Sequence, residues 1–134
     1  MFVDASAIVA LFSKEQEQSR VDDILGSTVG SFTSPLAVLE SVLALSRPDK
    51  WNVPVDEAAL SLVQLMRARD IVIRDVDNPS EVVHLASFAA ARFRSGRRGL
   101  NLADCMHYAS AKYYKVPILA TANEFRQTDL DVVP

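Results

Sequence analysis

The sequence predicts an α/β fold in which a mainly parallel sheet of four or five strands is flanked by helices. Apolar runs of strand length alternate along the chain with longer segments whose apolar residues recur at helical spacing. Such alternation is typical of parallel sheets, because a helix carries the chain back to the edge where the next strand begins. No repeat, low-complexity tract or flexible linker interrupts the 134 residues. We therefore expect a single domain over residues 1–134.

The first elements of this alternation lie in the amino-terminal third of the chain. Residues 1–4 are predicted to form a strand that leads into a helix over residues 6–12, and a polar helix covers residues 16–25. Glycines bracket the turn into a second strand at residues 31–34. Pro35 then suits the first turn of a helix, because its missing N–H would lack a helical partner there in any case.

The helix that begins at Pro35 is apolar along much of its length. Ser34 is its candidate N-cap, and the helix should stop before Pro48. Its leucines are expected to form the stripe that faces the sheet: Leu36, Leu39, Leu43 and Leu45. After a loop, an amphipathic helix is predicted over residues 55–69. The expected inner face of that helix consists of Leu60, Val63 and Met66.

The carboxyl-terminal half continues the alternation of strands and helices. The predicted elements are a strand at 71–73, a helix from 78–81 to about Gly96, a helix at 101–115, a strand at 117–120, a turn or short helix at 123–125 and an edge strand at 130–133.

Composition excludes several classes of protein. Hydrophobic residues make up 49% of the chain and charged residues 23%, as in ordinary soluble globular proteins. The apolar runs are too short to span a membrane, and the start MFVDAS lacks the basic region and cleavage site of a signal peptide. A single cysteine, Cys105, permits no internal disulfide. We therefore expect a cytoplasmic protein that does not insert into membranes.

Three acidic residues are each the single charge in an otherwise uncharged apolar stretch. They are Asp4 in MFVDASAIVALFS, Glu40 in SPLAVLESVLALS and Asp104 in GLNLADCMHYASA. An ionised carboxylate is seldom buried without a partner, because removing it from water costs several kcal/mol or more. Three such acids in segments that must form the core indicate convergence on one site. A bound cation there would satisfy all three, which points to a metal-dependent enzyme.

Each acid also has a structural alternative. Asp4 ends a predicted strand, where aspartate commonly caps the next helix, and Ser6 is placed to cap that helix or to hydrogen-bond to Asp4. Asp104 follows Asn101 at the spacing of a capping box. Glu40 is harder to explain structurally, because no Lys or Arg lies three or four residues away to pair with it along the helix. We therefore favour a functional role for Glu40 over a surface position.

The residue types around these acids indicate which cation the site would bind. His107 is predicted to be a neutral, hydrogen-bonded histidine in the core rather than a ligand, and Cys105 a small buried hydrophobe. Oxygen ligands without a histidine–cysteine set suit a hard cation such as Mg²⁺ or Mn²⁺ rather than zinc. These ions activate water and neutralise the charge that develops on a phosphate.

A cluster of arginines precedes the segment that carries Asp104. The formal net charge is −3, so the molecule as a whole is not a general nucleic-acid binder. A local basic patch beside an acidic centre would nevertheless hold a phosphate backbone against the bound cation. The alternative is a solvated helix end whose arginines complement the helix dipole. The cluster comprises Arg92, Arg94, Arg97 and Arg98.

Over essentially its full length the chain resembles PIN-domain ribonucleases, and in particular the VapC-type toxins of bacterial toxin–antitoxin pairs. The resemblance depends on four segments in order: MFVDASAIVA, the mid-helix glutamate of SPLAVLESVLAL, NLADCMHYASAK and PILATANEFRQTDLDVV. By position, the resemblance makes Asp4, Glu40 and Asp104 the principal metal-binding acids of the family. It makes Ser6 the hydroxyl residue that supports the first of them.

The resemblance is incomplete at a fourth position. The family often has another acid after the last core strand, where this chain reads Thr-Ala-Asn-Glu-Phe over residues 121–125. Asn123 occupies the expected position and adds no charge, and Glu124 would substitute if its side chain turned inward. The structural alternative is that the two residues cap a short helix. A second metal site is therefore an open question at this point.

The resemblance implies a PIN-like three-layer α/β/α fold and a function as an endoribonuclease toxin. A water activated by Mg²⁺ or Mn²⁺ would cleave structured RNA of the tRNA or rRNA class, while the arginines hold the backbone. A VapB-like antitoxin and a homodimer are the implied partners. The alternative function is a catalytically impaired PIN-like module that binds RNA or protein, with Asn123 marking the loss of a metal ligand.

Overall fold

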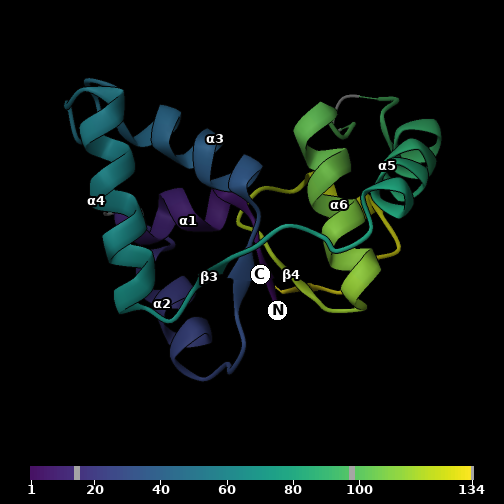
Figure 1. Cartoon of the computed structure of the whole chain (residues 1–134), viewed down its shortest axis with the longest axis horizontal. Coiled ribbons are helices and arrows are strands. Elements are labelled where there is room, and N and C mark those ends of the chain that lie inside the picture. Colours follow the sequence, from purple (N-terminus) through teal and green to yellow (C-terminus); the bar gives the residue numbers. More distant parts are fainter. Residues whose placement is uncertain (14–15, 97–98, 134) are drawn as a thin grey trace.

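A computed structural model describes residues 1–13, 16–96 and 99–133 as a parallel sheet with helices on both faces (Figure 1). Its elements are β1 (Phe2–Val3), α1 (Ala5–Phe12), α2 (Gln18–Gly26), β2 (Phe32–Thr33), α3 (Pro35–Leu45), α4 (Val55–Ala68), β3 (Val72–Ile73), α5 (Pro79–Phe93), α6 (Leu102–Tyr114), β4 (Ile118–Leu119), the 3₁₀ helix η1 (Glu124–Gln127) and β5 (Val132–Val133).

The sheet has the strand order β3-β2-β1-β4-β5, and all four pairings are parallel. Phe2 of β1 is in register with Phe32 of β2 and with Ile118 of β4, so β1 is the central strand. The expected parallel sheet of four or five strands is confirmed, with β5 at its edge as predicted.

Alternate residues of the strands build two separate cores. Val3 and Leu119 pack with residues of α1, α2, α3 and α4, whereas Phe2 and Ile118 pack with residues of α5 and α6. This separation follows from the strand geometry, because successive side chains point to opposite faces of a sheet. Figure 1 shows the two groups of helices on either side of the strands. The predicted three-layer α/β/α architecture is therefore confirmed.

Side-chain caps begin α3, α5 and α6 where the sequence predicted them, and Asp4 caps α1 in the same way. Ser34 accepts a hydrogen bond from the Ala37 N–H at 3.1 Å and precedes Pro35 at the first position of α3. Asn78 caps α5 and Asn101 caps α6 by the same kind of bond. These bonds satisfy N–H groups that have no partner within the helix and so determine where each helix starts.

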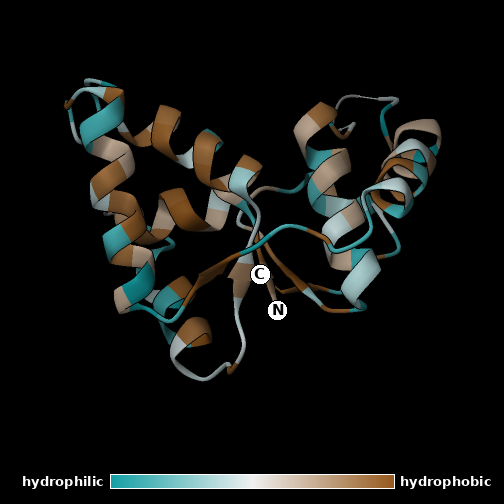
Figure 2. Cartoon of the chain, in the orientation of Figure 1, coloured by the Kyte–Doolittle hydropathy of each residue, from teal (hydrophilic) through white to brown (hydrophobic). Residues whose placement is uncertain are grey.

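The predicted buried stripe of α3 was wrong for Leu39 and Leu43 and correct for Leu45. Leu39 and Leu43 are 53% and 50% exposed, and the buried residues are Ala37, Val38, Ser41, Val42 and Leu45. Figure 2 shows that α3 is hydrophobic along most of its surface. Because apolar residues occur on both faces, hydrophobicity alone does not reveal which face packs. The smaller side chains face inward, where α3 approaches α1 closely.

The inner face of α4 also differs from the prediction. Leu60 is 70% exposed and Val63 is half-buried, whereas Met66 is fully buried as expected. The buried residues Ala58, Leu62 and Met66 recur every fourth position, which places them on one side of the helix. The predicted buried face of α4 therefore lies part of a turn around the helix axis from the face that is buried.

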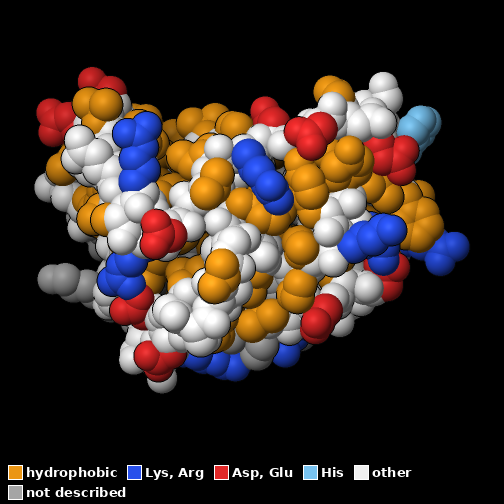
Figure 3. Space-filling model, turned by 60° about the horizontal axis from the view of Figure 1, so that its bottom comes forward, with side chains coloured by type: hydrophobic (Ala, Val, Ile, Leu, Met, Phe, Trp, Pro, Cys, Tyr) orange, Lys and Arg blue, Asp and Glu red, His pale blue; other side chains and the backbone are white. Residues whose placement is uncertain are grey.

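Several large apolar side chains are exposed on the described surface. They include Leu39, Leu43, Val83 and Phe88. Figure 3 shows hydrophobic side chains exposed across the middle of one face, with most charged side chains toward its two sides. None of the described helices is both long and apolar enough to cross a membrane.

Candidate active site at the carboxyl edge of the sheet

The strand order places a crevice between β1 and β4. The chain moves outward from β1 to β2 and β3, then crosses to β4 on the other side of β1. In open parallel sheets ligands bind beyond the carboxyl ends of the strands at such a reversal. A pocket of about 150 Å³ lies there, and its lining residues are Asp4, Ala5, Ser6, Glu40, Asp104, His107, Ala122, Glu124 and Phe125.

Asp4 both caps α1 and reaches into this pocket. Its Oδ2 accepts hydrogen bonds from the Ser6 N–H at 2.9 Å and from the Ser6 hydroxyl at 2.6 Å. Its Oδ1 lies 2.8 Å from Nδ1 of His107. The Ser6 Oγ in turn accepts the N–H groups of Thr121 and Ala122. Ser6 therefore connects the carboxyl end of β1 to that of β4 and fixes the Asp4 carboxylate between them.

Glu40 reaches the pocket from the middle of α3. Its Oε2 lies 3.1 Å from Nε2 of His107, and one third of its side chain is exposed. The two atoms are close but not aligned as a hydrogen bond, so each buried atom lacks a hydrogen-bond partner among residues 1–13, 16–96 and 99–133. The oxygen nevertheless faces a nitrogen that carries a proton and a positive charge when His107 is protonated, so an ion pair rather than an aligned hydrogen bond holds Glu40 at the pocket.

His107 lies between the two carboxylates and is 1% exposed. Burial by itself would lower the pKa of the imidazole, but the hydrogen bond to Asp4, the contact with Glu40 and the two negative charges outweigh burial. Together they raise the pKa of His107 to about 9. The predicted core position and hydrogen bond are correct, whereas the raised pKa favours the protonated imidazole over the predicted neutral one. The sequence did contain a signal that places His107 at the site, because His107 lies one helical turn after Asp104 on the same face of the helix.

Burial and charge also shift the pKa values of the two aspartates. Burial is the largest single influence on Asp4 and opposes its ionisation. The hydrogen bonds and charge of His107, together with the bonds from Ser6, nevertheless lower the pKa of Asp4. Burial, assisted by repulsion from Asp4 and Glu124, raises the pKa of Asp104 against the effect of the Asn101 N–H. Ionisation is therefore favoured for Asp4 and disfavoured for Asp104 relative to a free aspartate.

Asp104 also forms the capping box that the sequence suggested. The Asn101 N–H donates to its Oδ2 at 2.7 Å, and the Asp104 N–H donates to Oδ1 of Asn101 at 2.9 Å. This reciprocal pair holds Asp104 in the first turn of α6, beside the pocket. Asp104 therefore caps α6 and lines the pocket at the same time.

At the uncertain fourth position, the structure brings Glu124 to the site and not Asn123. Glu124 lines the pocket, and its Oε2 is buried without a hydrogen-bond partner in the described part of the chain. Asn123 is exposed, and its side chain makes no capping bond to η1. Four carboxylates therefore line one pocket: Asp4, Glu40, Asp104 and Glu124.

The four acids do not form a closed ligand cage. Within the described ranges, no group of three or more His, Cys, Asp or Glu side chains has the arrangement of a ready-made metal site. His107 lies between Asp4 and Glu40, and Asn101 engages one oxygen of Asp104. The protonated imidazole supplies the positive charge that these buried acids require in the chain without metal.

Comparison with known proteins identifies the family. A model described as PIN domain matches residues 1–130. The chain belongs to the PIN-domain family. A VapC ribonuclease of Rhizobium meliloti (strain 1021) is 31% identical over 142 residues, which span 96% of this chain and 98% of that protein. Ribonuclease VapC28 of Mycobacterium tuberculosis (strain ATCC 25618 / H37Rv) is 30% identical over 129 residues, which span 96% and 93%. Within the family, this PIN domain therefore falls in the VapC group.

A solved structure supports the same fold. The crystal structure of VapC20 of Mycobacterium tuberculosis superposes with a TM-score of 0.73 at 16% sequence identity. The superposition covers 96% of this PIN domain and 95% of VapC20, which is described as a toxin that cleaves the sarcin–ricin loop. At this level of identity the likeness establishes the three-layer architecture.

The two described arginines of the cluster, Arg92 and Arg94, do not line the acidic pocket of the PIN domain. Arg92 is in the last turn of α5, with its guanidinium 4.8 Å from the centre of the Phe88 ring, and Arg94 is the C-cap of the helix. Both side chains are exposed, and neither lines the acidic pocket. Arg97 and Arg98 lie outside the described residues.

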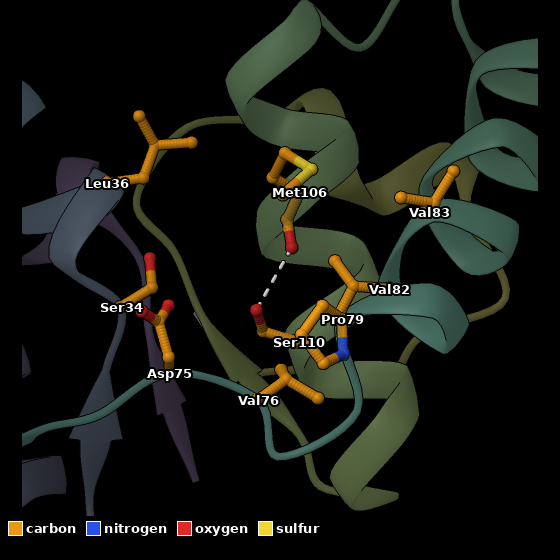
Figure 4. Close-up of a pocket in the computed structure, with 9 residues that line it drawn as sticks. All are labelled: Ser34, Leu36, Asp75, Val76, Pro79, Val82, Val83, Met106 and Ser110. Atoms are coloured by element: carbon orange, nitrogen blue, oxygen red, sulfur yellow. Dashed lines mark hydrogen bonds between the residues drawn. The ribbon is translucent and has the colours of Figure 1, made fainter.

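A larger, mostly apolar pocket of about 320 Å³ lies between α3, α5 and α6 (Figure 4). Leu36 of α3 faces Met106 of α6 across it, and Val83 of α5 forms its far side. The Ser110 hydroxyl donates to the Met106 carbonyl at 3.1 Å and is thus used within α6. Asp75 is the only carboxylate among its lining residues.

Proposed function

We propose that this PIN domain is a metal-dependent endoribonuclease that acts in the cytoplasm as the toxin of a type II toxin–antitoxin pair. The observation that carries the proposal is the pocket lined by four carboxylates, of which Asp4 and Glu40 share the single charge of His107, while Glu124 Oε2 is buried without a hydrogen-bond partner among the described residues. One imidazolium among four carboxylates leaves an excess of negative charge, which a bound cation would offset. The relatives named VapC ribonucleases support RNA cleavage as the reaction.

Mg²⁺ or Mn²⁺ fits this donor set, because both prefer carboxylate oxygens over nitrogen and sulfur. Asp4, Glu40 and Asp104 would hold the cation, and Glu124 would take the fourth position. A cation bound there activates water for attack on a phosphodiester and neutralises the charge that develops on the phosphate.

The residues of the chain prepare this site without rearranging its backbone. Ser6 fixes Oδ2 of Asp4, whose Oδ1 faces His107, and the Asn101 N–H fixes Oδ2 of Asp104, so both carboxylates are held in orientation at the pocket. His107 holds a proton on each ring nitrogen when it is charged, facing Asp4 and Glu40. In this role it keeps the acids ionised and oriented until the cation binds. Orientation of this kind reduces the cost of assembling the reactive complex.

The substrate would be structured RNA of the tRNA or rRNA class, cut where a loop leaves the strand exposed. The pocket is small and lies at the sheet edge, so a strand must bend out of a duplex to place its phosphate near the acids. The sarcin–ricin loop that is attributed to VapC20 is therefore one fragment to include in an assay, beside tRNA.

A VapB-like antitoxin would inhibit this site from the neighbouring apolar groove (Figure 4). Leu36 lies one turn before Glu40 on α3, and Met106 precedes His107 on α6. An apolar segment seated between Leu36 and Met106 would consequently cover the entrance to the acids. The chemistry of the groove suits an amphipathic helix with an apolar face.

A homodimer would bury the outer face of α3. Leu39 and Leu43 are one turn apart on that face and each about half exposed. Exposed apolar pairs of this kind commonly mark an interface. Because the pair lies on the helix that carries Glu40, a dimer formed there would also hold α3 in place relative to the site.

Cleavage of RNA with and without divalent metal tests the proposed function. The purified chain is incubated with end-labelled tRNA and with an rRNA fragment containing the sarcin–ricin loop. We expect discrete cuts at Mn²⁺ or Mg²⁺ concentrations on the order of 1 mM, because such ions are held weakly. We expect no cuts in EDTA. RNA that is bound but never cut at any metal concentration would favour the catalytically impaired binding module instead.

Replacing Glu124 should weaken metal binding where replacing Asn123 should not. Glu124→Gln removes a charge whose buried oxygen has no hydrogen bond to lose, whereas Asn123→Ala changes an exposed side chain. We expect Glu124→Gln to raise the Mn²⁺ concentration for half-maximal cleavage by about tenfold, and Asn123→Ala to leave it within about twofold. The opposite pattern would assign the fourth position to Asn123.

A further inference from the structure

A second small pocket adjoins the acidic one at the carboxyl end of β4. Its volume is about 100 Å³, and its lining residues are Glu17, Arg20, Val21, Ala120, Thr121 and Arg126. Thr121 lines this pocket and Ala122 the acidic pocket, and both N–H groups donate to the Ser6 Oγ that also binds Asp4. The two pockets therefore share one rigidly held segment of backbone.

Two arginines converge on this pocket from distant parts of the chain. Arg20 belongs to α2 and Arg126 to η1, and both side chains are exposed. Neither forms an ion pair with any residue in the described ranges, although Glu17 lines the same pocket. The Thr121 hydroxyl likewise donates no hydrogen bond to a described residue. The pocket thus presents two unpaired cations and a free hydroxyl beside four carboxylates.

We propose that Arg20, Arg126 and the Thr121 hydroxyl form a subsite for a backbone phosphate of the RNA strand, next to the phosphate that is cleaved. The proposal rests on the proposed function and deepens it, because it assigns how this site holds its substrate. Arginine suits the role, since its planar guanidinium donates two parallel hydrogen bonds to phosphate oxygens.

Electrostatics explains why such a subsite is needed. The acidic pocket repels an RNA backbone, and the net charge of −3 gives no general attraction. Arg92 and Arg94 lie at the end of α5, in a different half of the molecule from α2 (Figure 1), and they line neither pocket. Arg20 and Arg126 are therefore the cations placed to offset the acids on the β4 side of the site.

Binding measurements on charge-matched variants test the subsite. The probe is a fluorescein-labelled RNA hairpin, and its anisotropy is followed in Mg²⁺ at several salt concentrations for proteins carrying Asp104→Asn, which prevents cutting. On that background we expect Arg20→Ala and Arg126→Ala each to weaken binding roughly fivefold, because each removes a charge-assisted hydrogen bond. The double variant should lower the slope of log K against log salt by about 1.4, since each lost phosphate contact in a single strand contributes about 0.7.

Two further variants control for net charge and for folding. Arg67→Ala on the exposed end of α4 makes the same charge change away from both pockets and should leave binding within about twofold. Glu17→Gln should tighten binding by about two- to threefold, because it removes the one carboxylate that competes with phosphate in the pocket. A gain of affinity cannot result from unfolding.

Measurements of binding and of cleavage together distinguish the phosphate subsite from the proposed nuclease function. If Arg20→Ala, Arg126→Ala and Arg67→Ala bind RNA equally well, the subsite is overturned while cleavage by the wild-type chain still supports the nuclease. If the arginine variants weaken binding and Glu17→Gln strengthens it, the subsite is supported. Should the wild-type chain then fail to cut RNA in any metal, the proposed nuclease function fails and the phosphate subsite stands.

Discussion

Glu40→Gln should reduce RNA cleavage at least 100-fold while lowering the free energy of unfolding by about 1–2 kcal/mol. The amide has the same shape and preserves the packing, but it loses the ion pair between Oε2 and His107 Nε2 at 3.1 Å. The cost is moderate because one third of the Glu40 side chain is exposed. The substitution also removes the negative charge that a divalent cation would need in this pocket. Cleavage rates and urea denaturation of the same preparation measure the two effects.

The matched control is Glu57→Gln, which makes the same chemical change in the exposed first turn of α4. That variant should cut RNA at the wild-type rate. If Glu40→Gln also keeps the wild-type rate, Glu40 has no part in catalysis, and its mid-helix position is a surface feature. If instead the variant unfolds, the loss of cleavage says nothing about metal binding, and the smaller change Glu40→Asp is compared at a temperature where it is folded.

In EDTA, the free energy of unfolding should fall by about 3 kcal/mol between pH 6.5 and pH 9. The cause is His107, whose pKa is raised from 6.5 to about 9 by Asp4 and Glu40. A group whose pKa is raised on folding contributes stability that is fully present below its unfolded pKa. That contribution is lost as the pH rises through the folded pKa. Asp4 has the opposite sign, because its pKa is lowered on folding, and its contribution is lost below about pH 4.

His107→Gln should flatten this pH dependence. The amide keeps a hydrogen-bond donor near Asp4 but carries no charge, so the buried carboxylates lose their compensating cation. His84→Gln on the exposed face of α5 is the control and should retain the wild-type profile. Urea denaturation in EDTA at several pH values measures both. Parallel stability profiles for wild type and His107→Gln would show that the imidazole is neutral in the folded chain.

Much of the architecture could be predicted from the sequence because it depends on local patterns. The alternation of short apolar runs with helical segments predicted the parallel sheet, and Ser34–Pro35, Asn78 and Asn101 predicted three helix starts. These features depend on neighbouring residues and on the periods of strands and helices. The isolated charges of Asp4, Glu40 and Asp104 likewise predicted which acids meet, since a charge within an apolar stretch needs a partner in the core.

The buried face of a helix was harder to predict from the sequence, because it depends on the elements that pack against that helix. The leucines of α3 occur on both faces, so only the packing of α3 against the sheet, α1 and α4 determines that Ala37 and Val42 are buried while Leu39 and Leu43 are exposed. Tertiary structure likewise decides whether Asn123 or Glu124 lies at the fourth position of the site. Adjacent residues at the start of η1 point in different directions, and a difference of one position decides which side chain enters the pocket.

The sequence by itself determined the fold class and three of the acids, because periodicity and isolated charge are properties of short segments. Only the tertiary structure decided that His107 is charged, because its protonation depends on Asp4 and Glu40, which belong to other elements. It likewise decided that Arg20 and Arg126 share a pocket. Contacts of this kind follow from the strand order β3-β2-β1-β4-β5, which brings residues distant in the sequence to one edge of the sheet.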